Sequence, residues 1–140
     1  MDDRSRYESA ARVWTAMRAL VLEQEDRRRE VAEATGMSFV RSKALGKLAR
    51  RPLKMSELTT LLAVDKPYTT LVVDDLEKRG LVVRSVHPED RRCKIVTITA
   101  AGREVAERAA EILGRPPERL LELAPEELAL LDRVTANLAG

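Results

Sequence analysis

Apolar residues follow a helical period along most of the chain, most clearly in residues 66–79. Apolar or small side chains recur there at spacings of three and four, which predicts a helix with one buried stripe. Two cations precede Gly80, as is typical of a helix end. The residues predicted to face inward are Thr69, Val72, Val73 and Leu76.

A shorter helical pattern precedes this helix. Ser56 is a suitable N-cap, and the predicted apolar face consists of Leu58, Leu61 and Leu62. A tight turn at residues 63–65 then separates the two patterns. Two helices joined by such a turn form a helix-turn-helix.

Two β-branched runs follow, Val82–Val86 and Ile95–Thr99, on either side of a charged segment that contains Pro88. This pattern predicts a hairpin with a long loop. A helix-turn-helix followed by a basic hairpin is a winged helix-turn-helix, whose second helix enters the DNA major groove.

The rest of the chain is also helical in pattern. Predicted helices run from Arg4 to about Glu33, across the charged run that begins at Glu23, from Ser38 to about Arg51, from Ala100 to Leu113 with Thr99 as N-cap, over Glu118–Leu123, and from Pro125 to about Leu138. The predicted fold class is therefore mainly α with a small two-stranded β wing, in a single domain over residues 1–140.

Three motifs carry a family resemblance. The segments LEKRGLV from Leu76, PEDRR from Pro88 and VTITAAG from Val96 closely resemble the MarR family of bacterial transcriptional regulators, whose wing motif matches Asp90 and Arg92. The resemblance implies a winged helix-turn-helix DNA-binding region over residues 36–99. It also implies dimerisation helices over residues 1–35 and 100–140, and a homodimer on palindromic double-stranded DNA.

The terminal helices carry apolar stripes that need a partner. One alternative is that they pack on each other inside a monomer. The other, which the resemblance and two-fold symmetry favour, is a dimer interface. The predicted interface residues are Trp14, Leu120, Leu121, Leu128, Leu131 and Val134.

Charge is concentrated in the middle of the chain. Net charge is only +2, but residues 41–99 hold 13 Lys and Arg against 7 Asp and Glu. This excess favours nucleic acid as the partner of the middle segment, and a solvated basic face is the alternative. One Cys and one His exclude an internal disulfide and an ordinary zinc site. The sequence also shows no catalytic motif, signal peptide or membrane-spanning run, so we expect a cytoplasmic protein that is not an enzyme and has no cofactor.

Candidate DNA contacts follow from this assignment. On the second helix of the pair, polar tips could bond phosphates or base edges and apolar ones could meet thymine methyl groups. MarR-like sequences often hold Arg where this chain has Leu71, and Asp74 and Asp75 add negative charge, so we expect little direct reading of guanine. Arg92, oriented by Asp90, could enter the minor groove. The predicted DNA-binding residues are Lys54, Ser56, Lys66, Pro67, Tyr68, Thr70, Leu71, Arg84, Asp90, Arg91, Arg92 and Lys94.

Alternatives remain for several of these residues. Tyr68 could be a packed residue at the helix start, and the wing tip could be a solvated hairpin with a weak ion pair. Cys93 lies beside cations that could lower its pKa, or it could be a passive strand residue.

The family resemblance also implies an effector, a small aromatic or phenolic ligand bound between the dimerisation helices and the winged region. Ordinary core packing is the alternative for each apolar candidate. The candidate lining residues are Trp14, Met17, Arg18, Met37, Phe39, Arg41 and Leu45.

The sequence therefore predicts a dimeric, sequence-specific DNA-binding regulator that represses transcription and leaves its operator when the ligand binds. Activation is possible instead, because the direction of control depends on where the operator lies. The alternative function is a winged-helix protein-interaction module, which would lack salt-dependent affinity for DNA.

Overall fold

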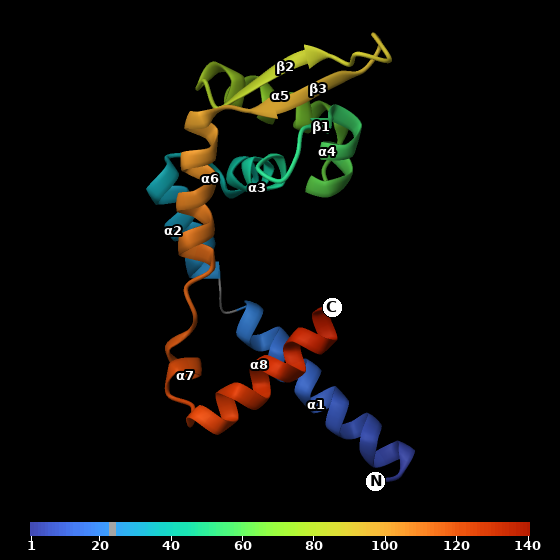
Figure 1. Cartoon of the computed structure of the whole chain (residues 1–140), viewed down its shortest axis with the longest axis vertical. Helices are drawn as coiled ribbons and strands as arrows, with labels where there is room; N and C mark the ends of the chain where they lie inside the picture. The colour runs from blue at the N-terminus through green and yellow to red at the C-terminus, as the bar shows by residue number, and fades with distance from the viewer. Residues whose placement is uncertain (23–24) are drawn as a thin grey trace.

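The computed structural model describes residues 1–22 and 25–140, and it contains a winged helix flanked by further helices. The winged helix is built from α3 (Phe39–Leu48), β1 (Leu53–Lys54), α4 (Met55–Leu62), α5 (Lys66–Lys78), β2 (Val82–Val86) and β3 (Lys94–Ile98). Figure 1 shows the hairpin of β2 and β3 lying across one end of this unit, with α5 behind it and α4 below it.

The sheet has one strand more than the sequence predicts. Its order is β1-β3-β2, and both pairings are antiparallel. Leu53 pairs with Val96 in one ladder, and Arg84 pairs with the same residue in the other. The hairpin itself is confirmed, whereas β1 is only two residues long and therefore has no periodicity to detect.

The core lies between α3, α4, α5 and the sheet. All four residues of the predicted inner stripe of α5 are buried, as Thr69 and the three aliphatic side chains are each 0% exposed. The side chains that pack with them include Leu45, Leu48, Leu53, Leu58, Val82 and Val96.

Two details of α4 differ from the prediction. Leu61 is 41% exposed, so the buried face of α4 consists of Leu58 and Leu62. Ser56 is not the N-cap, because the helix begins one residue earlier and Lys54 occupies the cap position. The Lys54 amide donates to Glu57 Oε1 at 3.1 Å, so a carboxylate within the first turn satisfies the helix start.

The predicted turn between α4 and α5 is confirmed, and it requires an unusual backbone conformation. Ala63 closes α4 with φ of 55°. Gly80 ends the turn after α5 with φ of 74°, a left-handed conformation that glycine adopts without steric cost.

The predicted N-terminal helix is two helices in the structure. These are α1 (Asp3–Leu22) and α2 (Glu25–Thr35), and they run in different directions in Figure 1. Residues 23–24, at the start of the charged run, lie outside the described residues. Helix α2 packs against α6 (Ala100–Leu113), where Val31, Ala109 and Ile112 form a second small core.

The C-terminal elements are α6, a short α7 (Glu118–Leu121) and α8 (Pro125–Ala139). Thr99 is the N-cap of α6 as predicted, because its hydroxyl accepts from the Gly102 amide at 3.1 Å. Neither α1 nor α8 contains a buried residue. Both lie away from the winged helix in Figure 1. Trp14 is 63% exposed, so the structure does not show the alternative in which the terminal stripes bury each other in a monomer.

Candidate nucleic-acid interface

A groove lies where the starts of α4 and α5 face the wing. Its volume is about 320 Å³, and five of its ten lining residues are cationic. No carboxylate lines it within the described chain. A concave surface with this charge attracts and concentrates a polyanion. The lining residues are Lys54, Met55, Ser56, Thr59, Lys66, Thr70, Arg84, Arg92, Cys93 and Lys94.

The wing tip is a structured turn that holds Arg92 by way of Asp90. Asp90 Oδ1 accepts from the Arg92 amide at 3.1 Å and from Arg92 Nε at 3.3 Å. The first of these bonds is the main cause that holds the pKa of the Asp90 carboxyl below its usual range. The Arg92 side chain is nevertheless 91% exposed. Asp90 therefore orients the Arg92 guanidinium through its Nε atom, while the rest of the side chain remains accessible to a ligand.

Helix α5 presents its first two turns to solvent. The Asp65 carboxylate caps the helix by accepting from the Tyr68 amide at 2.8 Å. The buried Thr69 hydroxyl meets that of Thr59 at 2.9 Å, which joins α5 to α4. The exposed residues are Lys66, Pro67, Tyr68, Thr70 and Leu71, all of which the sequence assigned to DNA contact.

Arg84 connects the wing to α5. Its guanidinium forms ion pairs with Asp74 and Glu77, the latter at 3.1 Å, and its amide donates to the second Glu77 oxygen at 3.0 Å. The Arg84 side chain is the main cause that lowers the pKa of Glu77. In the absence of DNA, the Arg84 guanidinium therefore already has two carboxylate partners on α5, the recognition helix of the winged helix-turn-helix.

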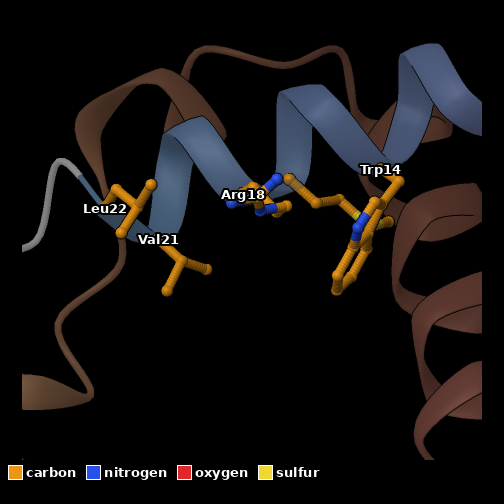
Figure 2. Close-up of a pocket in the computed structure, with 5 residues that line it drawn as sticks. Trp14, Arg18, Val21 and Leu22 are labelled. Atoms are coloured by element: carbon orange, nitrogen blue, oxygen red, sulfur yellow. The ribbon is translucent and has the colours of Figure 1, made fainter.

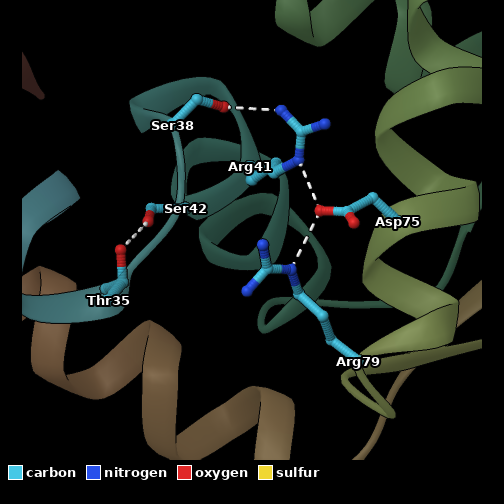
Figure 3. Close-up of polar contacts among 6 residues, drawn as sticks. All are labelled: Thr35, Ser38, Arg41, Ser42, Asp75 and Arg79. Atoms are coloured by element: carbon cyan, nitrogen blue, oxygen red, sulfur yellow. Dashed lines mark hydrogen bonds and ion pairs between the residues drawn. The ribbon is translucent and has the colours of Figure 1, made fainter.

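Asp75 connects α5 to α3. One of its oxygens accepts from Arg41 Nε at 2.7 Å and from Arg79 Nε at 2.9 Å, as Figure 3 shows. Arg41 also donates to the Ser38 hydroxyl at 2.8 Å. The pKa of Asp75 is lowered, mainly by the hydrogen bond from Arg79 and then by that from Arg41. The negative charge that the sequence placed near the DNA-facing side of α5 is thus offset by arginines.

The family model described as "MarR family" matches residues 48–94, from the end of α3 to the first residue of β3. The solved structure of the transcriptional regulator Tm0710 from Thermotoga maritima is 26% identical, covers 93% of each chain and superposes with a TM-score of 0.75. The segment from residue 48 to residue 94 therefore resembles the MarR family.

Two further solved structures are similar to this chain. Apo MarR from E. coli has a TM-score of 0.75 at 21% identity, over 90% of this chain and 95% of that one. The transcriptional repressor CouR, solved on a 23-mer DNA duplex, has a TM-score of 0.64 at 27% identity. That match covers 89% of this chain and 90% of CouR.

The predicted DNA-contact residues fall into three groups. Lys54, Ser56, Lys66, Thr70, Arg84, Arg92 and Lys94 line the groove. Pro67, Tyr68 and Leu71 are exposed on α5, and Asp90 and Arg91 lie at the wing tip. The sequence missed Met55, Thr59 and Cys93 as lining residues. The one-turn spacing of Thr59 from Met55 was a usable signal once the helix start was placed correctly.

The predicted effector residues are not brought together in the structure. Trp14, Met17 and Arg18 line a shallow pocket of about 250 Å³ made by α1 alone, shown in Figure 2. Met37 and Leu45 are core residues, 5% and 0% exposed. Arg41 is held by Asp75, 2.7 Å away.

Phe39 lies in a different cleft, between the end of α1 and the loop after α6. This cleft of about 570 Å³ also contains Leu20, Arg28 and Leu113. The guanidinium carbon of Arg28 lies 5.0 Å from the Phe39 ring centroid, within the range of a cation–π contact. Among the predicted effector residues, Phe39 is therefore the one that lies beside an exposed cation, Arg28, in this cleft.

Cys93 is half-buried, and its thiol donates to Asp90 Oδ2 at 3.6 Å. No group of three or more potential metal ligands occurs in residues 1–22 and 25–140. None of the helices described there is long and apolar enough to span a membrane.

Proposed function

We propose that this chain is a sequence-specific, double-stranded-DNA-binding transcriptional regulator that acts as a homodimer. The observation that carries the proposal is the cationic groove between the start of α5 and the wing, with Arg92 oriented by Asp90. In a winged helix of this kind, α5 lies in the major groove and its first turns face the base edges. The exposed Arg92 at the tip suits a narrow minor groove, whose potential attracts arginine.

The dimer brings two such surfaces to one palindromic site. The exposed apolar side chains of α1 and α8, including Trp14, Leu128 and Val134, supply an apolar surface from both ends of the chain. A two-fold axis through these helices would place two recognition helices on the same face of the duplex, about one turn of DNA apart. Symmetric pairing therefore accounts for both the exposed apolar stripes and the single reading helix per chain.

The direction of control that we propose is repression, by occlusion of a promoter. CouR, a repressor 27% identical to this chain, was solved on DNA, which supports this direction by similarity. We further propose that a small aromatic acid binds the cleft beside Phe39 and Arg28. Such a ligand releases DNA only if it binds the released conformation more tightly than the DNA-bound one.

The test is fluorescence anisotropy with labelled duplexes at two salt concentrations. DNA from upstream of the chain's own gene is compared with a scrambled duplex of the same composition. Selective binding that weakens as salt rises supports the proposal, since the release of counterions from neutralised phosphates makes affinity salt-dependent. Arg92→Ala should weaken binding by about 1–3 kcal/mol while leaving the folding transition unchanged.

Arg108→Ala is the matched control, because it removes the same charge from an exposed position on α6 outside the groove. Equal losses in the two variants would mean that only net charge matters and would remove the wing from the interface. Absence of DNA binding at low salt would instead favour the protein-interaction module.

A further inference from the structure

The outward face of α5, the predicted recognition helix, carries large apolar side chains among its polar ones over the first two turns. Leu71 is 55% exposed and Tyr68 is 37% exposed, and the exposed Pro67 lies beside them. Removing a large apolar side chain from water lowers the free energy. In the major groove, the apolar group available for such a contact is the C5-methyl group of thymine.

The polar groups of the same helix are largely committed inside the protein. The Thr70 hydroxyl donates to the Lys66 carbonyl at 3.2 Å, and the Asp65 carboxylate caps the helix. The Thr70 hydroxyl can then only accept, so Lys66 and the hydroxyl of Tyr68 are the hydrogen-bond donors that this face still presents among the described residues.

The guanidinium groups near α5 are also engaged. Arg79 is bound to Asp75 on its own helix, at the end remote from the first turns. Arg41 is bound to the same carboxylate, and Arg84 is bound to Asp74 and Glu77. Guanine is read most often by a bidentate arginine, and the described part of α5 presents none over its first two turns.

We propose that Leu71, supported by the Tyr68 ring, is a specificity-determining residue that reads the methyl group of thymine. The half-site facing the start of α5 should then be selected for T·A pairs, and guanine should carry little of the preference there. This inference rests on the proposed DNA-binding function and specifies what the recognition helix selects.

The expected size of the effect follows from the transfer of one methyl group. Burying a group of that size stabilises by about 0.8 kcal/mol, so loss of one contacted methyl should weaken binding about fourfold. A symmetric dimer that loses the methyl from both half-sites should bind about fifteenfold more weakly.

The experiment begins with selection of duplexes from a random pool by the full-length chain. In the selected duplex, each thymine of one half-site is then replaced in turn by deoxyuridine, which keeps the base pair and removes only the methyl. Affinity is measured by anisotropy for wild type and for Leu71→Ala. Because Leu71 is exposed, this variant should fold normally, which circular dichroism and thermal unfolding check.

Wild type should lose about fourfold at one substituted thymine, and Leu71→Ala should be insensitive to that same substitution. Leu71→Arg should move the selected preference towards guanine at the facing pair, because it supplies the missing guanidinium. Equal affinity of wild type for all thymine and deoxyuridine duplexes, with selective binding retained, would overturn this inference alone. Selection that enriches no sequence would overturn the proposed function and this inference together.

Discussion

At the residue scale, Gly102 illustrates how tightly the wing joins α6. A Cβ at this position would overlap the Leu81 carbonyl oxygen and come within 2.7 Å of the Ile98 side chain. The first of these neighbours is backbone and cannot rotate away. Gly102→Ala should therefore lower the free energy of unfolding by about 1–3 kcal/mol, measured by urea denaturation.

Gly46 provides the matched control for this prediction. It lies inside α3, is exposed, and has no neighbour within 4 Å of an added Cβ. Gly46→Ala should raise the unfolding free energy by about 0.5–1 kcal/mol, because alanine has the higher helix propensity. If both glycine variants were more stable than wild type, the result would contradict the close packing of Gly102 against Leu81 and Ile98.

At this scale, the sequence predicted a helix cap correctly where a single side-chain hydrogen bond determines the helix start. Thr99 was predicted as the cap of α6 because a hydroxyl before an apolar period suits that position, and it is the cap. Ser56 has the same chemistry but lies inside α4, because the cap position is Lys54, two residues earlier, where Glu57 accepts from the Lys54 amide. Two competing caps a few residues apart cannot be ranked without the strand β1, which fixes where the chain enters the helix.

At the scale of elements, Arg84 determines how the wing is held against the recognition helix. The sequence predicted a phosphate contact for Arg84, and the structure pairs its guanidinium with Asp74 and Glu77. Arg84→Met retains much of the aliphatic stem and leaves two carboxylates unpaired on a helix that faces DNA. We expect about a tenfold loss of DNA affinity, measured by anisotropy.

A double-mutant cycle separates the two roles of Arg84. In a background of Asp74→Asn with Glu77→Gln, a positioning role predicts that Arg84→Met costs little further affinity. A phosphate contact predicts the full loss in both backgrounds. A full loss of affinity in both backgrounds would show that Arg84 contacts DNA directly, as the sequence predicted.

The junction of α3 and α5 should make stability depend on acid pH through Asp75. Its pKa is lowered in the folded chain by Arg79 and Arg41, below the ordinary value of 3.8. A carboxyl with a depressed folded pKa stabilises fully above its unfolded value, and that stabilisation is lost as pH falls through the folded pKa. Asp75→Asn should therefore cost about 1 kcal/mol near neutral pH, and the difference from wild type should shrink below about pH 4.

Denaturant unfolding at a series of pH values from neutral to acid tests this prediction. Glu107→Gln on the exposed face of α6 is the control and should leave the acid dependence unchanged. A constant difference between wild type and Asp75→Asn across the range would mean that the two arginines do not stabilise the carboxylate.

Elements with a long, regular period were predictable, and those defined by tertiary contacts were not. The stripe of α5 spans two turns and is buried as predicted. The packing of α2 on α6 rests on Val31 against Ala109 and Ile112, residues far apart in the sequence. The predicted effector residues do not line one pocket, and the local sequence could not show this. Leu45 lies in the core and Phe39 in a cleft, although the local patterns around the two residues are alike.

At the scale of the whole molecule, the apolar faces of α1 and α8 require a partner. Leu131 lies on α8 among the residues that line an open apolar hollow with Leu120 and Leu128. Leu131→Asp would place a charge in the proposed interface, and the cost of burying it should prevent pairing. The variant should sediment as a monomer where wild type sediments as a dimer. It should also bind an operator roughly a hundredfold more weakly, because each half-site must then be bound alone.

Trp14 gives this prediction an optical readout, because it is the chain's single tryptophan and is 63% exposed on α1. If the dimer covers α1, wild-type emission should lie at shorter wavelength than that of Leu131→Asp. Leu61→Asp is the control, since Leu61 is 41% exposed on α4, away from the terminal helices. It should remain dimeric with wild-type emission. A Leu131→Asp variant that stays dimeric would move the interface off this face of α8, whereas a monomer with unchanged emission would exclude Trp14 from the contact while leaving α8 within it.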